Sequence, residues 1–179
     1  METPLHPAIV HLPLGLAVVL PIAALGVAVA LWRGWLPARA WVGVVALQAM
    51  LVGGGLLGLV SGERDEERVE RAVGEAAIES HEHAAQRFVA AGALTLAVAV
   101  TALAFARRPA WQRSAQLATA ALTVGVLGLA LNVGHQGGQL VYGKGGAAAW
   151  TTASADGPMA GESGAEGEHE GKKGDRDDD

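Results

Sequence analysis

Histidines are the side chains of this sequence whose type and position could support chemistry. Five of the six histidines lie at the ends of long apolar stretches: His6, His11, His81, His83 and His135. Imidazole is a versatile ligand of metal ions and haem iron, and it is costly to place in hydrocarbon. Ionisable rings gathered at the edge of apolar segments therefore indicate a functional site.

The residue types that are absent narrow the chemistry of this site. The sequence contains no cysteine, which excludes disulfides, iron–sulfur clusters, thiolate metal sites and covalent c-type haem attachment. Ser80 lies near His83, but no nucleophile, base and orienting residue form a recognisable hydrolytic pattern. No glycine-rich loop of the phosphate-binding kind is present in the sequence either. The histidines are therefore best considered as ligands.

Four apolar segments have to position these histidines. A helix needs roughly 20 mostly apolar residues to cross about 30 Å of hydrocarbon, and 51% of the residues are hydrophobic. The segments that qualify run from about residue 9 to 32, 41 to 61, 88 to 106 and 116 to 134. The sequence therefore predicts an all-α fold, an integral membrane four-helix bundle formed by residues 1–143.

The remaining residues, 144–179, consist mainly of Gly, Ala, Glu and Asp. Such a segment cannot bury enough apolar surface to offset the loss of chain entropy. We predict that it is a disordered acidic tail, and we assign no function to its single histidine, His169.

The distribution of charge predicts how the spans are oriented. The connectors after the first and third spans contain five arginines and no acidic residue: Arg33, Arg39, Arg107, Arg108 and Arg113. The connector between the second and third spans and the tail are rich in Glu and Asp instead. Because short cytoplasmic loops collect Lys and Arg, we expect both termini and the central connector to lie outside the cytoplasmic (inner) membrane of a bacterium.

The central connector, residues 62–87, predicts an amphipathic outer helix between spans 2 and 3. Its apolar positions recur every three or four residues: Val69, Val73, Ala76, Ala77, Ala84 and Phe88. His83 falls on this stripe, whereas His81 is roughly 200° away from His83 around the helix. The pattern therefore predicts that His83 points inward and that His81 faces water.

Helical geometry then selects the candidate ligands. His11, His83 and His135 come from three different spans and lie at a similar depth on the outer side. His6 and His11 diverge by about 140° in a regular helix, so His6 joins them only if the chain is irregular nearby. We predict His11, His83 and His135 as cofactor-binding residues, with His6 as the fourth candidate.

The opening stretch resembles a family of bacterial membrane proteins. Residues 5–15 read Leu-His-Pro-Ala-Ile-Val-His-Leu-Pro-Leu-Gly, which is similar to the start of the four-span family called domain of unknown function 2231. Members typically have Phe where this chain has Leu12. Gly137, Gly138 and the sequence ending at Tyr142 match a later stretch of the family. The resemblance implies a four-span fold and a histidine before the third span, best matched by His83. Related domains occur joined to Rieske or cytochrome c modules, and this association implies a role in redox chemistry.

Three hypotheses describe what the histidines do. The first is a b-type haem held by His11 with His83 or His135, with Arg87 as a partner for a propionate. The second is a divalent metal, Zn or Cu, which requires all three rings to meet within a few ångströms because metal–nitrogen distances are about 2 Å. The third is a structural or partner-binding membrane module without a cofactor. The loose distribution of the histidines favours haem over a metal ion, and the module without a cofactor stays open as an alternative.

The sequence also predicts partners. Under all three hypotheses the protein contacts the lipid bilayer, and no feature of the sequence indicates a nucleic acid as a partner. With haem, we expect electron transfer to or from a periplasmic redox protein.

Overall fold

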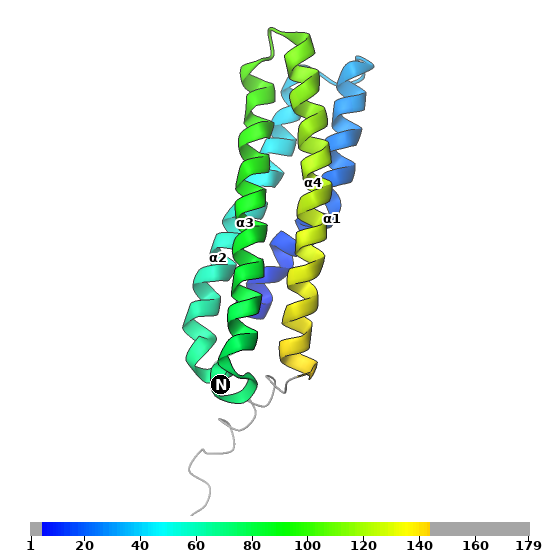
Figure 1. Cartoon of the computed structure of the whole chain (residues 1–179). Helices are drawn as coiled ribbons and strands as arrows, with labels where there is room; N and C mark the ends of the chain where they lie inside the picture. The colour runs from blue at the N-terminus through cyan, green and yellow to red at the C-terminus, as the bar shows by residue number, and fades with distance from the viewer. Residues whose placement is uncertain (1–4, 144–179) are drawn as a thin grey trace, which may run out of the picture.

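The computed structural model describes residues 5–143, apart from the side chains of residues 5, 7 and 64–72. Four long helices make up nearly all of this part: α1 (Leu5–Trp32), α2 (Trp41–Val73), α3 (Glu75–Ala104) and α4 (Pro109–Gly138). A 3-10 turn, Ala38–Ala40, precedes α2, and a π-helical turn, Gln139–Gly143, follows α4. No strand occurs between residues 5 and 143, and the predicted all-α four-helix bundle is confirmed (Figure 1). The predicted tail lies outside the described residues.

The helices form a closed ring in chain order. Each one packs against the helix before and after it, and α4 packs against α1. The α1–α2 and α3–α4 connectors lie at one end of the bundle, and the α2–α3 turn lies at the other (Figure 1). We call the second end the hairpin end. Because the ring is closed in this order, α1 and α3 face each other diagonally across the interior.

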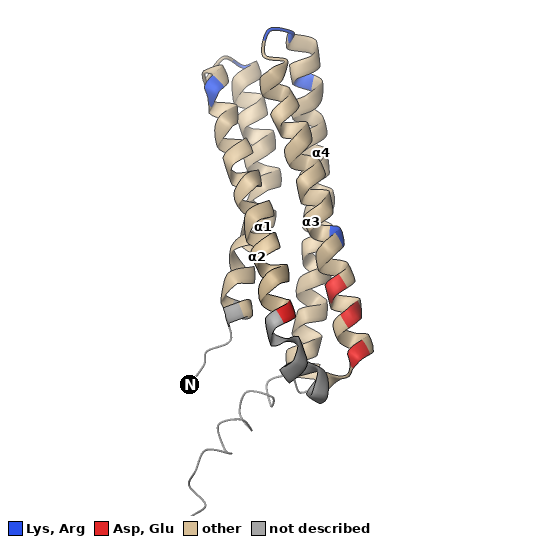
Figure 2. Cartoon of the chain, turned by 90° about the vertical axis from the view of Figure 1, so that its left-hand side faces the viewer, with Lys and Arg blue, Asp and Glu red and all other residues tan. Residues whose placement is uncertain are grey.

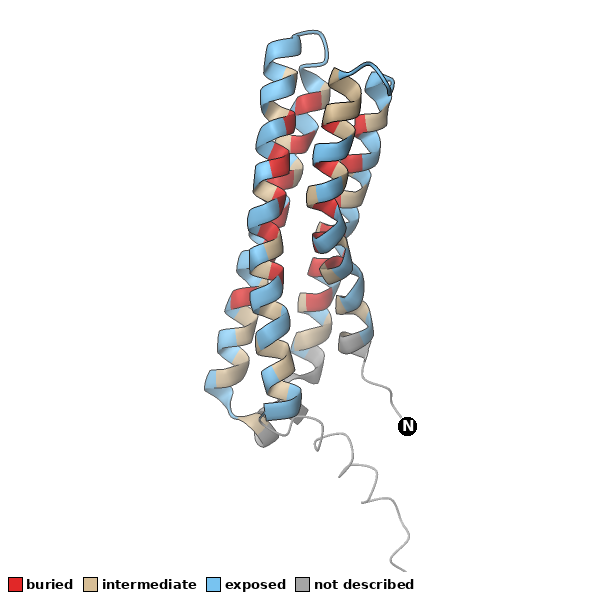
Figure 3. Ribbon diagram, turned by 90° about the vertical axis from the view of Figure 1, so that its right-hand side faces the viewer, coloured by how far each residue is buried: buried red, intermediate tan, exposed pale blue. Residues whose placement is uncertain are grey.

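The surface of this bundle is rich in large apolar side chains. Large apolar side chains point outward on every helix, with Ile22 76% exposed on α1 and Leu131 64% exposed on α4. The buried positions that line the interior in Figure 3 are largely occupied by alanine, and they include threonine and glutamine. A soluble bundle shows the opposite arrangement, because water excludes large apolar side chains from the surface.

All four helices are long and apolar enough to cross a membrane. The candidate spans are Ala8–Trp32, Ala38–Glu63, Glu75–Ala104 and Pro109–Gly143. Together with the apolar surface, these spans support a multi-pass membrane protein whose outer faces contact lipid.

Polar side chains inside the bundle hydrogen-bond between helices. Gln48 donates from Nε2 to the carbonyl of Gly92 over 3.0 Å, and Trp32 donates from Nε1 to Oε1 of Gln116 over 2.7 Å. Such bonds stabilise association of helices in lipid, where burial of apolar surface contributes little. Gln48 is fully buried, and its Oε1 has no hydrogen-bond partner among the described residues.

The glycines of α2 bring it close to both neighbours. Gly54, Gly58 and Gly62 recur every four residues and face α1, where a Cβ on Gly54 would lie 3.1 Å from Cδ of Pro13. A Cβ on Gly55 would lie 2.8 Å from Cγ2 of Val89 in α3. Such close approach of backbones is a main source of helix association in lipid. Gly125 and Gly128 of α4 differ, since a Cβ there would meet nothing within 4 Å.

The central connector is helical, as predicted, but it is divided into two parts. α2 continues through it to Val73, and α3 begins at Glu75. Gly74 joins the two helices with a φ of 85°, a left-handed conformation that glycine adopts without steric cost. The outer helix is therefore the combined ends of α2 and α3, and helical phase does not carry across Gly74.

Charge is segregated between the ends of the bundle. Most basic residues that are drawn lie at the end with the α1–α2 and α3–α4 connectors, Arg87 of α3 lies between the two ends, and the acidic residues that are drawn lie toward the hairpin end (Figure 2). The long stretches between the two ends carry almost no charge, as expected of segments in contact with lipid.

Candidate functional site: a histidine pair between diagonal helices

Two histidines from diagonal helices meet at the hairpin end. His6 belongs to the first turns of α1, and His81 belongs to the second turn of α3. Their ring centroids are 6.4 Å apart, and the ring planes are nearly perpendicular at 81°. The structure therefore brings together one predicted candidate, His6, and one histidine that the sequence pattern assigned to the surface.

The tautomer of His6 follows from its hydrogen bonds. Its Nδ1 lies 3.0 Å from the carbonyl oxygen of Gly58 and 3.0 Å from Oγ of Ser61. Ser61 itself donates to the same carbonyl over 3.0 Å. Because a carbonyl oxygen can only accept, Nδ1 of His6 carries the hydrogen, and Nε2 of the neutral ring keeps its lone pair. Histidines that ligate metals are commonly oriented in this way, with the other ring nitrogen bonded to a backbone carbonyl.

His81 has a buried nitrogen that is not satisfied. The side chain is partly buried, and its Nδ1 has no hydrogen-bond partner among the described residues. A buried polar atom without a partner costs roughly 1–3 kcal/mol. Such an atom in a native structure calls for an explanation, and a bound group is one of them.

Glycines of the other two helices flank the rings. A Cβ on Gly62 of α2 would lie 3.4 Å from Cε1 of His6. A Cβ on Gly137 of α4 would lie 3.3 Å from Cε1 of His81. Each imidazole thus packs against backbone where a larger residue would displace it. All four helices contribute to the pair, two with rings and two with glycines.

The separation of the rings suits a metal atom between them. Metal–nitrogen distances for histidine are about 2.0–2.1 Å, so two imidazoles on opposite sides of one metal have centroids roughly 6–6.5 Å apart. The observed 6.4 Å lies within that range, and it is also an ordinary separation for two rings packed edge to face. In the part of the chain that the structure describes, no group of three or more His, Cys, Asp or Glu residues could hold a metal ion.

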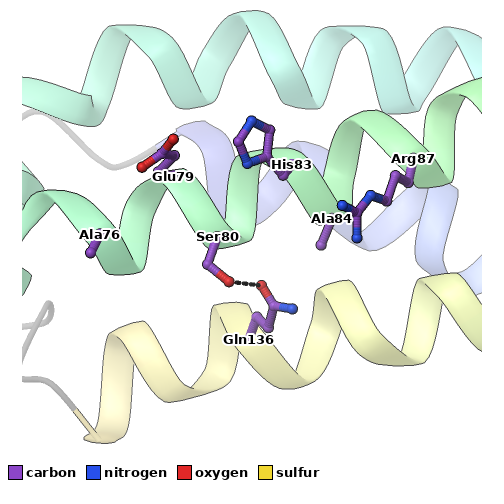
Figure 4. Close-up of a pocket in the computed structure, with 7 residues that line it drawn as sticks. All are labelled: Ala76, Glu79, Ser80, His83, Ala84, Arg87 and Gln136. Carbon is purple, nitrogen blue, oxygen red and sulfur yellow. Dashed lines mark hydrogen bonds between the residues drawn. The ribbon is translucent and has the colours of Figure 1, made fainter.

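The other predicted ligands lie elsewhere. His11, His83 and His135 are all exposed, so the prediction that they form the inward-facing set is wrong. Nε2 of His135 lies 2.9 Å from Nε2 of Gln139, one turn along its own helix. His83 lines a groove between α3 and α4 (Figure 4).

The prediction that His81 faces water is also wrong. The predicted stripe assigns His83 to the inward side, but two of its members, Ala84 and Phe88, are buried in α3 and lie within about 60° of His81 around the helix. The phase of α3 is set by its own span, where Phe88, Thr95 and Ala102 are buried at intervals of seven residues. Counting seven residues back from Phe88 gives His81, on the same side of the helix. This repeat is present in the sequence and could have identified His81.

Comparison with known proteins does not identify a family or a function for this chain. No protein-family model, curated protein or solved structure matches the chain. The functional argument therefore depends on the residues themselves.

Proposed function

We propose that this protein is a multi-pass protein of the bacterial inner membrane that binds a b-type haem between His6 and His81 and transfers electrons. We also propose that the chain is related to the four-span family that its opening stretch resembles. The observation that carries it is the diagonal pair of imidazoles at 6.4 Å. Bound haem would supply one-electron redox chemistry.

The number of ligands favours haem over a bare metal ion. A porphyrin supplies four nitrogens, so haem iron needs only two protein ligands. Structural zinc sites use four protein ligands, and catalytic zinc sites use three. The described residues offer two imidazoles and no larger ligand group.

The positions of the glycines suit a flat ligand across the diagonal. His6 of α1 and His81 of α3 would hold the haem, and α2 and α4 lie on either side of these two rings. The residues beside the histidines on those helices are Gly62 and Gly137. Bundles place cofactors between facing helices in this manner, and small residues allow close approach.

The distribution of charge supports the proposed orientation in the membrane and the proposed periplasmic redox partner. The arginine-rich connectors favour the cytoplasmic side for the end opposite the site. The histidine pair then lies on the periplasmic side, within reach of a periplasmic redox protein. The exposed carboxylates of Glu75 and Glu79 at that end favour a partner with a basic docking surface.

The test is an absorption spectrum of the protein, purified in detergent after expression with ample haem supply. We expect a Soret band that sharpens and shifts on reduction, and its loss in His6→Ala and in His81→Ala. The matched controls are His11→Ala, His83→Ala and His135→Ala, which remove an exposed imidazole and should keep the band.

Three results would overturn the proposal in distinct ways. A band lost only in the controls would return the site to the exposed histidines. A colourless protein with Zn or Cu by elemental analysis would establish the metal alternative. A colourless protein without metal would favour a structural or partner-binding module.

A further inference from the structure

A polar groove runs between α3 and α4 near the hairpin end. It has a volume of about 330 Å³, and its lining includes Glu79, Ser80, His83, Ala84, Arg87 and Gln136. This groove is separate from the histidine pair, although the two share a helix. His81 and Gly137 contact each other inside the bundle, and the residues just before them, Ser80 and Gln136, face the groove (Figure 4).

Arg87 is the cation of this groove and has no partner there. Among the described residues it forms no ion pair or hydrogen bond, and it is exposed. It directly precedes the apolar run that begins at Phe88, so it lies where the helix enters hydrocarbon. An exposed guanidinium at the end of a span extends into the interfacial region, where the phosphates of lipids lie.

Neutral donors lie at the other end of the groove. Ser80 donates from Oγ to Oε1 of Gln136 over 3.4 Å, and Nε2 of Gln136 lies 3.4 Å from Oδ1 of Asn132. Both contacts are long for hydrogen bonds, so the donors remain available to a better acceptor. Figure 4 shows the guanidinium of Arg87 extending over Ala84 toward Ser80, on the side that faces α4. The small side chain of Ala84 leaves the space between the donors open.

The single carboxylate limits the charge that the groove accepts. Glu79 lines the groove, and it points away from Gln136 (Figure 4). One arginine beside one glutamate suits a monoanion better than a dianion, because a second negative charge would be repelled. A phosphodiester carries one negative charge and offers two oxygens to a guanidinium fork.

We propose that this groove binds the phosphodiester of an anionic phospholipid. Arg87 pairs with the phosphate oxygens, and Ser80 and Gln136 donate to the headgroup. Leu94 lies seven residues beyond Arg87 on the same face of α3 and is 59% exposed, so the acyl chains continue along an apolar surface. The lipid site does not depend on haem.

The test is native mass spectrometry of the full chain, stripped of lipid in detergent and titrated with phosphatidylglycerol. Arg87→Gln should weaken binding about tenfold, the effect of losing a charge-assisted pair. Ser80→Ala should weaken binding about threefold, as expected of a neutral hydrogen bond. The matched control is Arg113→Gln, which removes the same charge at the opposite end and should leave this site unchanged.

Two further arms identify the ligand. Phosphatidylcholine, whose choline cancels the net charge, should bind at least several-fold more weakly. Inorganic phosphate in millimolar excess should not displace the lipid; displacement would overturn the lipid assignment in favour of free phosphate. Equal loss of binding in Arg87→Gln and Arg113→Gln would overturn the site itself. The titration repeated with His6→Ala should give the same result, whether or not the protein binds haem.

Discussion

Two imidazoles, those of His6 and His81, have surroundings that the exposed histidines lack. His6 is held in one tautomer because Gly58 presents a carbonyl oxygen 3.0 Å from Nδ1. His81 has a buried Nδ1 with no partner among the described residues. The first ring is fixed by hydrogen bonds at Nδ1, and the second has a buried nitrogen without one. The three exposed histidines share the residue type but not these surroundings.

A substitution at Gly137 tests this environment directly. A Cβ there would lie 3.3 Å from Cε1 of His81, and the branches of valine would push the ring away from His6. We expect Gly137→Val to lower the free energy of unfolding by about 1–3 kcal/mol through overpacking, and to reduce the haem content under the proposed function. Thermal unfolding in detergent and the Soret absorbance measure the two effects.

The control for this variant is Gly134→Val. Gly134 is exposed on the same helix, and a Cβ there would meet nothing within 4 Å. It carries the same valine without the contact with His81. Equal unfolding midpoints for the two variants would show that Gly137 does not position the ring.

Glycines determine how closely the helices approach. α2 has glycines toward α1 at Gly54 and Gly58, toward α3 at Gly55, and toward open space at Gly53. Sequence identifies all of these as small residues suited to packing in lipid. It does not distinguish which of three consecutive glycines meets which helix, because that depends on the rotation of α2 between its neighbours.

Gly55→Ala and Gly53→Ala form a matched pair that tests this assignment. A Cβ on Gly55 would lie 2.8 Å from Cγ2 of the buried Val89, so the helices must separate. We expect a loss of about 1–3 kcal/mol in the free energy of unfolding, measured by denaturation in mixed micelles. Gly53→Ala should cause no loss, and Gly55→Ala combined with Val89→Ala should recover part of the stability. A larger loss for Gly53→Ala than for Gly55→Ala would contradict this packing.

The whole molecule is a bundle whose apolar surface contacts lipid, with its charges segregated to the two ends. That segregation underlies the proposed orientation, in which the hairpin end and the histidine pair lie on the periplasmic side. The orientation decides whether a periplasmic protein can exchange electrons with the site.

The lack of native cysteine makes this orientation easy to test. Glu79 is exposed at the hairpin end, and Ala106 is exposed in the connector at the opposite end. In intact spheroplasts a membrane-impermeant maleimide should label Glu79→Cys, and it should label Ala106→Cys only after lysis. The reverse pattern would place the histidine pair on the cytoplasmic side.

The sequence by itself determined the architecture of this protein. Four apolar stretches of sufficient length leave few alternatives to four helices in a bilayer, since a backbone in lipid must satisfy its own hydrogen bonds. The sequence also contains the spacing that places His81 on the buried face of α3. What it could not reveal is which histidines meet.

Only the tertiary structure decided that point. The ring order of the helices places α1 and α3 on a diagonal, and the left-handed Gly74 resets the helical phase before α3. His6 and His81 are 75 positions apart in sequence, so their contact depends on how two helices are rotated and staggered against two others. Those quantities follow from packing across the whole bundle, and local patterns do not contain them.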